Sequence, residues 1–96
     1  MLKFMAAVIG VLSIAAAVVA SAEPPAGAAS CSGCHPASTG VTTPVPRLIG
    51  LDQAAIVRAM QEFRSGQRAG TVMDRIAKGF TDEEIQAIAA WYATQR

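Results

Sequence analysis

The amino-acid sequence predicts an all-α fold of three to four short helices, and three observations carry this prediction. Apolar residues recur at helical spacing between Asp52 and Gly66. A helix-start signature stands at Thr81, directly before a second apolar stripe. No stretch alternates apolar and polar residues as a half-buried strand does. With 96 residues, the chain has room for one small domain.

The first helix and the loop after it are marked by proline, glycine and threonine. Pro24 and Pro25 precede residues 26–32, which can form a short first helix. Residues 38–50 are rich in Thr, Pro and Gly, so an extended loop is expected there.

The second helix has a predicted start and end. Asp52 is a suitable N-cap, and Ser65-Gly66 suits a helix end. The apolar positions between them follow the spacing i, i+3, i+4 and i+7, at Ile56, Ala59, Met60 and Phe63. An amphipathic helix is therefore expected.

The C-terminal part predicts a loop, a helical turn and a last helix. Residues 67–72 form the loop, Met73 follows it, and the turn runs from Asp74 to Lys78, with Gly79 ending it. Thr81 and Glu84 then have the spacing of a capping box. The expected inward stripe of this last helix is Ile85, Ile88, Ala89 and Tyr92.

The N-terminus has the pattern of a secretory signal peptide. A basic start that includes Lys3 is followed by an apolar run over residues 4–20, and Ala20-Ser21-Ala22 fits a cleavage site. The prediction is a signal peptide at 1–22, a mature domain at 23–96 and a periplasmic location. An uncleaved membrane anchor stays open as the alternative, because the apolar run approaches the roughly 18 residues that a span requires.

The charge balance of the predicted mature chain is neutral. The full sequence has eight Lys and Arg against seven Asp and Glu, and loss of Lys3 leaves seven of each. Such a balance indicates neither nucleic acid nor an anionic membrane surface as a partner, and no stable membrane insertion is expected after cleavage.

The sequence Cys31-Ser32-Gly33-Cys34-His35 has the spacing of a c-type haem attachment motif. Two cysteines on one helical turn can reach the two vinyl groups on one edge of a porphyrin, while the adjacent His35 ligates the iron. We therefore expect one haem c, bound covalently through Cys31 and Cys34, in a protein that moves electrons.

Other interpretations of the motif are weaker. A thioredoxin-like redox pair needs alternating strands and helices, and a zinc site needs four ligands where this chain offers Cys31, Cys34 and His35. A structural disulfide across two residues would constrain the unfolded chain little and leave His35 unexplained. A domain below about 80 residues usually needs a disulfide, a metal or another stabilising group. Here the haem would fill that role, so the haem-free form should fold poorly.

The second axial ligand of the iron decides the chemistry. His35 is the only histidine, so the remaining candidates are Met60, Met73, Lys78 or an empty position. Met60 lies on a helical apolar stripe, where methionine usually fills a core. Met73 follows a loop and has no competing core role, so it is the predicted sixth ligand. Methionine with histidine raises the reduction potential, and a six-coordinate iron favours electron transfer over catalysis.

With these features the chain resembles class I cytochrome c of the short bacterial kind. The resemblance is carried by the Cys31–His35 motif, the Pro46-Arg47-Leu48 loop, a methionine about forty residues after the motif and an aromatic terminal helix. It implies that the Pro46 carbonyl accepts the His35 N–H, that Leu48 packs on the haem, and that Trp91 or Tyr92 meets the first helix near Gly27.

A narrower resemblance lies in Phe63-Arg64-Ser65-Gly66 and in residues 71–80. These segments are similar to the haem subunits of flavocytochrome c sulfide dehydrogenases, in which the methionine corresponding to Met73 is the axial ligand. This implies an electron carrier that is itself no catalyst and accepts electrons from a flavoprotein that oxidises sulfide. The alternatives are a free periplasmic shuttle to a terminal oxidase or photosynthetic centre and, less favoured, an open-iron gas-binding or catalytic cytochrome.

Five basic residues have two interpretations. They can hold haem propionates or steer a docking partner, or they can form a solvated rim, which is the usual role of exposed charges. The residues are Arg47, Arg64, Arg68, Arg75 and Lys78.

Overall fold

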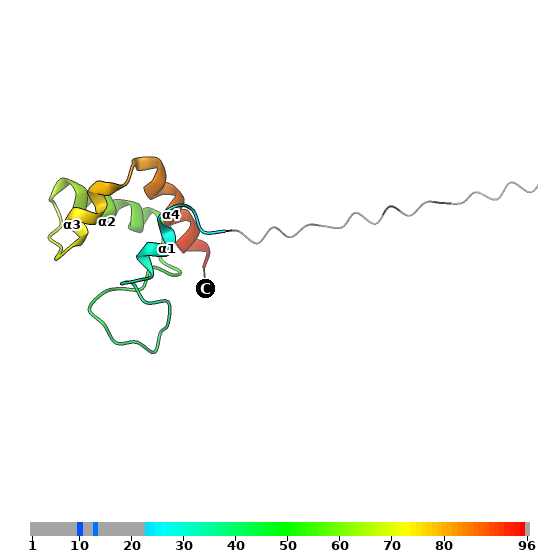
Figure 1. Cartoon of the computed structure of the whole chain (residues 1–96), viewed down its shortest axis with the longest axis horizontal. Helices are drawn as coiled ribbons and strands as arrows, with labels where there is room; N and C mark the ends of the chain where they lie inside the picture. The colour runs from blue at the N-terminus through cyan, green and yellow to red at the C-terminus, as the bar shows by residue number, and fades with distance from the viewer. Residues whose placement is uncertain (1–9, 11–12, 14–22, 96) are drawn as a thin grey trace, which may run out of the picture.

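The computed structural model describes Gly10, Ser13 and residues 23–95, and this part of the chain contains helices and no strand (Figure 1). The predicted all-α class is confirmed. The predicted signal segment lies almost entirely outside the described residues. Within the described part, no helix combines the length and the apolar character needed to cross a membrane.

The first helix, α1, spans Ala28–Cys31 and is shorter than predicted. Gly27 precedes it with a φ of 87°, which favours glycine. A Cβ at this position would also lie 2.6 Å from Cε1 of Phe80 and 3.5 Å from Cδ1 of Ile88. Gly27 therefore permits both the turn into α1 and its close approach to the C-terminal part of the chain.

The second helix, α2, spans Gln53–Ser65 and has the predicted boundaries. The Asp52 side chain accepts a hydrogen bond from the Ala55 N–H, with 3.2 Å between Oδ2 and N. Gly66 ends the helix with a φ of 83°.

A short helix, α3, spans Met73–Ile76, and a 3-10 turn, η1, continues it over Ala77–Gly79. The prediction placed Met73 just before the helical turn, whereas the structure begins the helix with it. The N–H groups of Arg75 and Ile76 both donate to the Val72 carbonyl, so the first turn already includes Met73.

The last helix, α4, spans Asp82–Thr94 and starts with the predicted capping box. The Glu84 N–H donates to Oγ1 of Thr81 over 3.2 Å, and the Thr81 N–H donates to Oε1 of Glu84 over 2.9 Å. All four predicted inward residues are buried: Ile85, Ile88, Ala89 and Tyr92.

The core lies where α1, α2 and α4 meet. The four inward residues of α4 pack there with Ala28, Ile56 and Val57. Val57 was absent from the predicted stripe of α2, because the stripe followed one line of positions and α2 also packs on α4. No residue of α3 is buried, so α3 forms the side of the domain away from this core.

Candidate cofactor site

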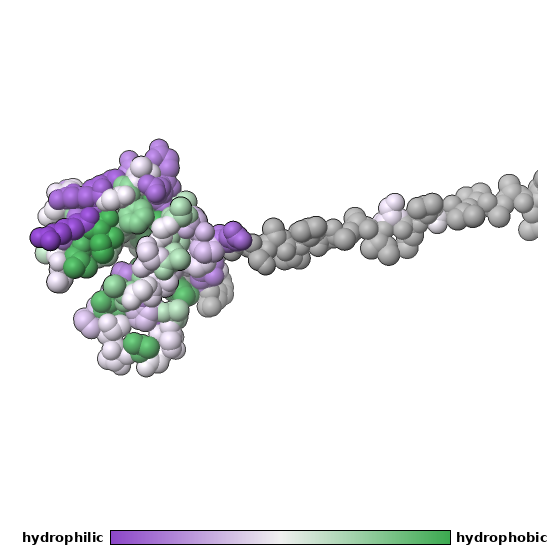
Figure 2. Space-filling view, viewed as in Figure 1, coloured by the Kyte–Doolittle hydropathy of each residue, from purple (hydrophilic) through white to green (hydrophobic). Residues whose placement is uncertain are grey.

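A large apolar cavity lies between α1, the loop 44–51, α2 and α3. Its volume is about 730 Å³, which is in the range of sites for bound organic cofactors. Its walls are mostly aliphatic and aromatic. Figure 2 shows apolar side chains exposed on the α2 and α3 side of the molecule, next to hydrophilic side chains.

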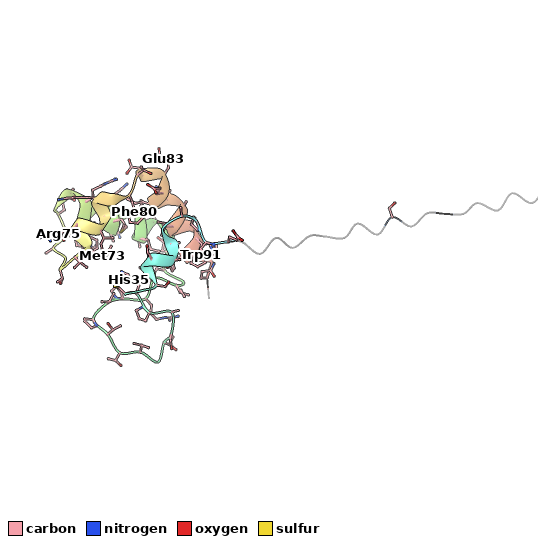
Figure 3. All side chains as sticks on the ribbon, viewed as in Figure 1. His35, Met73, Arg75, Phe80, Glu83 and Trp91 are labelled. Atoms are coloured by element: carbon pink, nitrogen blue, oxygen red, sulfur yellow. The ribbon has the colours of Figure 1, made fainter. Side chains whose placement is uncertain are left out.

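All six residues predicted to bind the cofactor line this one cavity. They come from α1 and the turn after it, from the following loop, and from the start of α3: Cys31, Cys34, His35, Pro46, Leu48 and Met73. Figure 3 shows His35 and Met73 on these separate segments. The fold thus brings together residues that are 38 positions apart in the sequence.

The His35 ring is oriented by a backbone carbonyl. Nδ1 lies 2.6 Å from the carbonyl oxygen of Pro46, and because a carbonyl can only accept, Nδ1 carries the proton. This tautomer leaves the lone pair of Nε2 free to ligate a metal. A hydrogen bond of this kind also increases the basicity of the ligating nitrogen.

A second interaction closes the loop beside His35. The guanidinium of Arg47 donates from Nε and Nη2 to the Ala37 carbonyl, over 3.2 and 3.0 Å. The loop between Ala37 and Pro46 is therefore tied at its base by two contacts, one of which holds His35.

The two cysteines sit on one turn of the chain. The N–H groups of Cys34 and His35 both donate to the Cys31 carbonyl, over 3.2 and 2.9 Å. Burial raises the pKa of the Cys31 thiol, whereas Cys34 is exposed. Both sulfurs are free and line the cavity, as covalent attachment of a porphyrin edge requires.

Two methionines line the cavity, and they differ in their surroundings. Met60 lies on α2 and packs against the hydrophobic core. Met73 is half-buried at the start of α3 and is not part of that core cluster. Lys78, the third candidate for the sixth ligand, is exposed on η1 and does not line the cavity.

These residues fit a haem. The cavity supplies an apolar wall, two thiols for covalent attachment, one oriented imidazole and two thioethers. Haem iron in electron carriers is held by this combination of imidazole and thioether. Within the described residues there is no cluster of three or more His, Cys, Asp or Glu for a metal ion alone.

Much of the wall was not identified from the sequence. Val72, Ile76 and Phe80 line the cavity, although the sequence placed none of them on an inward helical stripe. Three residues of the predicted stripes line it as well: Phe63, Ile85 and Ile88. Helical spacing gave the signal that these residues face inward. It could not separate residues facing a core from residues facing a cofactor.

Three of the five basic residues bind other parts of the chain. Besides Arg47, Arg64 donates to the Phe80 carbonyl and pairs with Asp82, and Arg68 pairs with Glu62. Arg75 and Lys78 are exposed. For each of the five, the sequence suggests propionate binding, steering of a docking partner or a solvated rim. The internal contacts of Arg47, Arg64 and Arg68 add a structural role that none of these interpretations includes.

The chain is similar to several known cytochromes. It is 40% identical over 63 residues to the "Cytochrome subunit of sulfide dehydrogenase" of Chlorobaculum tepidum, covering 66% of this chain and 57% of that protein. It is 33% identical over 70 residues to "Cytochrome c-554(548)" of Halomonas halodenitrificans, covering 69% of this chain and 84% of that protein. No protein-family model matches the sequence.

A third relative is longer than this chain. The "Thiosulfate dehydrogenase electron acceptor" of Stutzerimonas stutzeri is 38% identical over 65 residues, which cover 66% of this chain. The chain spans only 30% of that relative and 57% of the Chlorobaculum protein. It spans 84% of the Halomonas cytochrome, which is therefore a relative of comparable length.

Proposed function

The chain belongs to the cytochrome c family, and from this premise we propose that it carries single electrons with His35 and Met73 as the two axial ligands. Its helical fold is that of a small class I cytochrome c. It holds one haem c, covalently bound through Cys31 and Cys34. The bound haem supplies one-electron redox chemistry.

One observation carries the ligand assignment. The cavity that contains both cysteines and the oriented His35 is also lined by Met73, from a segment without a core role. Pro46 fixes the imidazole, and Leu48 supplies apolar wall next to the core. The remaining apolar side chains exclude water, which favours the less charged, reduced form of the site.

The test compares two methionine variants of the haem-loaded protein. Met73→Leu should lose the weak far-red sulfur-to-iron absorption band and lower the reduction potential, because the thioether ligand favours reduced iron. Met60→Leu should keep both, since Met60 packs against the core. A Met73→Leu protein with an unchanged spectrum would refute the assignment.

For the partner, we propose a flavoprotein that oxidises sulfide, with this chain as its haem subunit. The Chlorobaculum relative is by name the cytochrome subunit of a sulfide dehydrogenase, and the Stutzerimonas relative is by name an electron acceptor of a thiosulfate dehydrogenase. Both names place similar chains next to enzymes of reduced sulfur compounds. A free shuttle is the second candidate, favoured by the similarity to the Halomonas cytochrome, of which the chain spans 84%.

We propose further that residues 1–22 direct the chain to the periplasm and are removed. Mass spectrometry of the purified protein tests this, since cleavage leaves a chain from Glu23 carrying one haem. The partner is tested by a separate experiment. A sulfide-oxidising flavoprotein encoded nearby should transfer electrons rapidly from sulfide to the cytochrome. Equal reduction by sulfide without the flavoprotein would favour the free shuttle.

A further inference from the structure

Gly70 lies against the side chains of Phe63 and Met73 in the loop between α2 and α3. A Cβ at this position would be 2.9 Å from Cε1 of Phe63 and 3.3 Å from Cβ of Met73. Real Cβ atoms show essentially no contacts as short as the first. The φ of Gly70 is not in the left-handed region, so backbone conformation does not require glycine there. Close packing is the remaining physical reason for it.

The Phe63 ring is also contacted by Arg68. The guanidinium carbon of Arg68 lies 5.6 Å from the ring centroid, within the range of a cation–π interaction. Its nitrogens Nε and Nη2 lie 3.0 and 2.9 Å from Oε2 of Glu62, and its backbone N–H donates to the Glu62 carbonyl over 3.1 Å. Three contacts to Glu62 thus fix the arginine that stacks on Phe63.

These contacts form a continuous series from the end of α2 to the start of α3. Glu62 holds Arg68, and Arg68 stacks on Phe63. Phe63 and Met73 together occupy the space that a side chain at position 70 would need. Arg68, Phe63 and Met73 all line the cavity. Because α3 has no buried residue of its own, its position depends on such contacts.

We propose that Gly70, Phe63 and Arg68 are positioning residues that hold the Met73 thioether over the iron and limit its dissociation. This inference rests on the proposed role of Met73 as the sixth ligand. We call these three residues the methionine brace. The brace keeps the loop 67–72 closed, and opening of that loop releases Met73 and exposes the sixth position to small molecules.

Imidazole binding to the oxidised protein measures this opening directly. Imidazole can occupy the iron only in molecules whose Met73 has dissociated, so its apparent affinity rises with the open fraction. The sulfur-to-iron band and the reduction potential report the same equilibrium independently. A urea unfolding midpoint, measured in parallel, separates loop opening from global loss of stability.

Gly70→Ala and Gly79→Ala form a matched pair. Both add one methyl group, but a Cβ at Gly79 meets nothing within 4 Å. Gly70→Ala should bind imidazole about tenfold more tightly, which corresponds to about 1.4 kcal/mol of easier opening, and should weaken the band and lower the potential. Gly79→Ala should match the wild type. The double variant Gly70→Ala/Phe63→Leu should recover only in part, because the smaller side chain relieves the contact with the added methyl group but also removes the aromatic ring on which Arg68 stacks.

A second pair tests the arginine. Arg68→Gln and Arg75→Gln each remove one positive charge, but Arg75 makes no ion pair with any residue that the structure describes. Arg68→Gln should increase imidazole affinity about threefold, as loss of an exposed cation–π contact predicts, and Arg75→Gln should not. Equal effects in both variants would mean that charge alone acts, and would overturn the role of Arg68 in the brace.

The remaining outcomes separate the two proposals. A wild-type protein without the sulfur-to-iron band overturns the assignment of Met73, and the brace with it. If the band is present, and Gly70→Ala equals Gly79→Ala in band, potential and imidazole affinity, the brace is wrong and the ligand assignment stands. A Gly70→Ala defect that Phe63→Leu fails to relieve also overturns the brace, because the Phe63 contact is its central element.

Discussion

The side-chain hydroxyl of Tyr92 donates a hydrogen bond to the backbone carbonyl of Ala28 over 2.6 Å, joining the two ends of the domain across 64 positions of the chain. Both residues are buried, so water cannot replace the bond when it is lost. The resemblance to class I cytochromes c had implied that Trp91 or Tyr92 meets the first helix near Gly27. Tyr92 makes this contact at the next residue, while Phe80 and Ile88 lie against Gly27 itself.

Tyr92→Phe should lower the free energy of unfolding by about 1 kcal/mol, because the Ala28 carbonyl loses its buried donor. Urea unfolding of the haem-loaded protein gives this value. Thr94→Val is the control, since the Thr94 hydroxyl donates to the Trp91 carbonyl at an exposed position. Equal effects of the two substitutions would contradict a special role for the buried bond.

Alkaline pH should destabilise the protein through the same residue. Burial raises the pKa of Tyr92, so the folded protein keeps the phenol proton at a pH where the unfolded chain, with its tyrosine pKa near 10, has lost it. The stability that Tyr92 contributes is therefore complete below about pH 10 and is lost as the pH rises through the higher folded pKa. Tyr92 is the only tyrosine, so Tyr92→Phe should flatten this part of the curve of unfolding free energy against pH. Parallel curves for the wild type and Tyr92→Phe would contradict this role of Tyr92 in the pH dependence.

Removal of the haem attachment should unfold the domain. In Cys31→Ala/Cys34→Ala no thioether can form, and a cavity of about 730 Å³ in so small a chain is left without a covalently held occupant. We expect loss of most of the far-UV circular dichroism of the helices and no haem mass on the chain. Each single variant should keep one thioether and fold with reduced stability. A fully helical double variant without haem would show that the apolar core alone suffices.

Arg47→Gln should loosen the loop that presents the Pro46 carbonyl to His35. The contacts of Arg47 are exposed, so the loss of stability should be below about 1 kcal/mol. A weaker hydrogen bond to His35 makes the imidazole less basic, which stabilises oxidised iron less and raises the reduction potential. Protein-film voltammetry measures this shift, with Arg75→Gln as the control, because Arg75 is exposed and does not line the cavity. A lower or unchanged potential in Arg47→Gln would be inconsistent with the proposed link.

The helices were largely predictable from the sequence because their signals are local. Asp52 and Gly66 bound α2, and Thr81 with Glu84 starts α4, in each case through contacts within a few residues. The predicted helical turn began at Asp74, one residue later than α3 begins, because the end of a loop was the only sequence signal there. Val57 was missed because a single helical stripe does not reveal that a second helix packs on the same element.

The site was predictable where its chemistry requires a fixed residue type. Cys31, Cys34 and His35 form a motif, and Pro46, Leu48 and Met73 were inferred from ligand chemistry and family resemblance; the structure brings all six to one cavity. The contacts among Phe63, Arg68 and Gly70 were beyond reach. They depend on how the loop 67–72 returns over α2. A glycine that is needed for close packing cannot be recognised from sequence spacing or from residue type.

The uneven burial of the domain has a consequence for its motion. Over α3 and η1 only Ala77 is buried, whereas α4 contributes four buried residues. Backbone amides around Met73 should therefore exchange with deuterium early, and those of α4 late. A thioether binds ferrous iron more tightly than ferric iron. Amide exchange around Met73 should therefore be slower in the reduced protein than in the oxidised protein, whereas exchange in α4 should be the same in both. The short segment 73–79 would become more rigid when the iron is reduced and more mobile when it is oxidised, while α4 would stay unchanged.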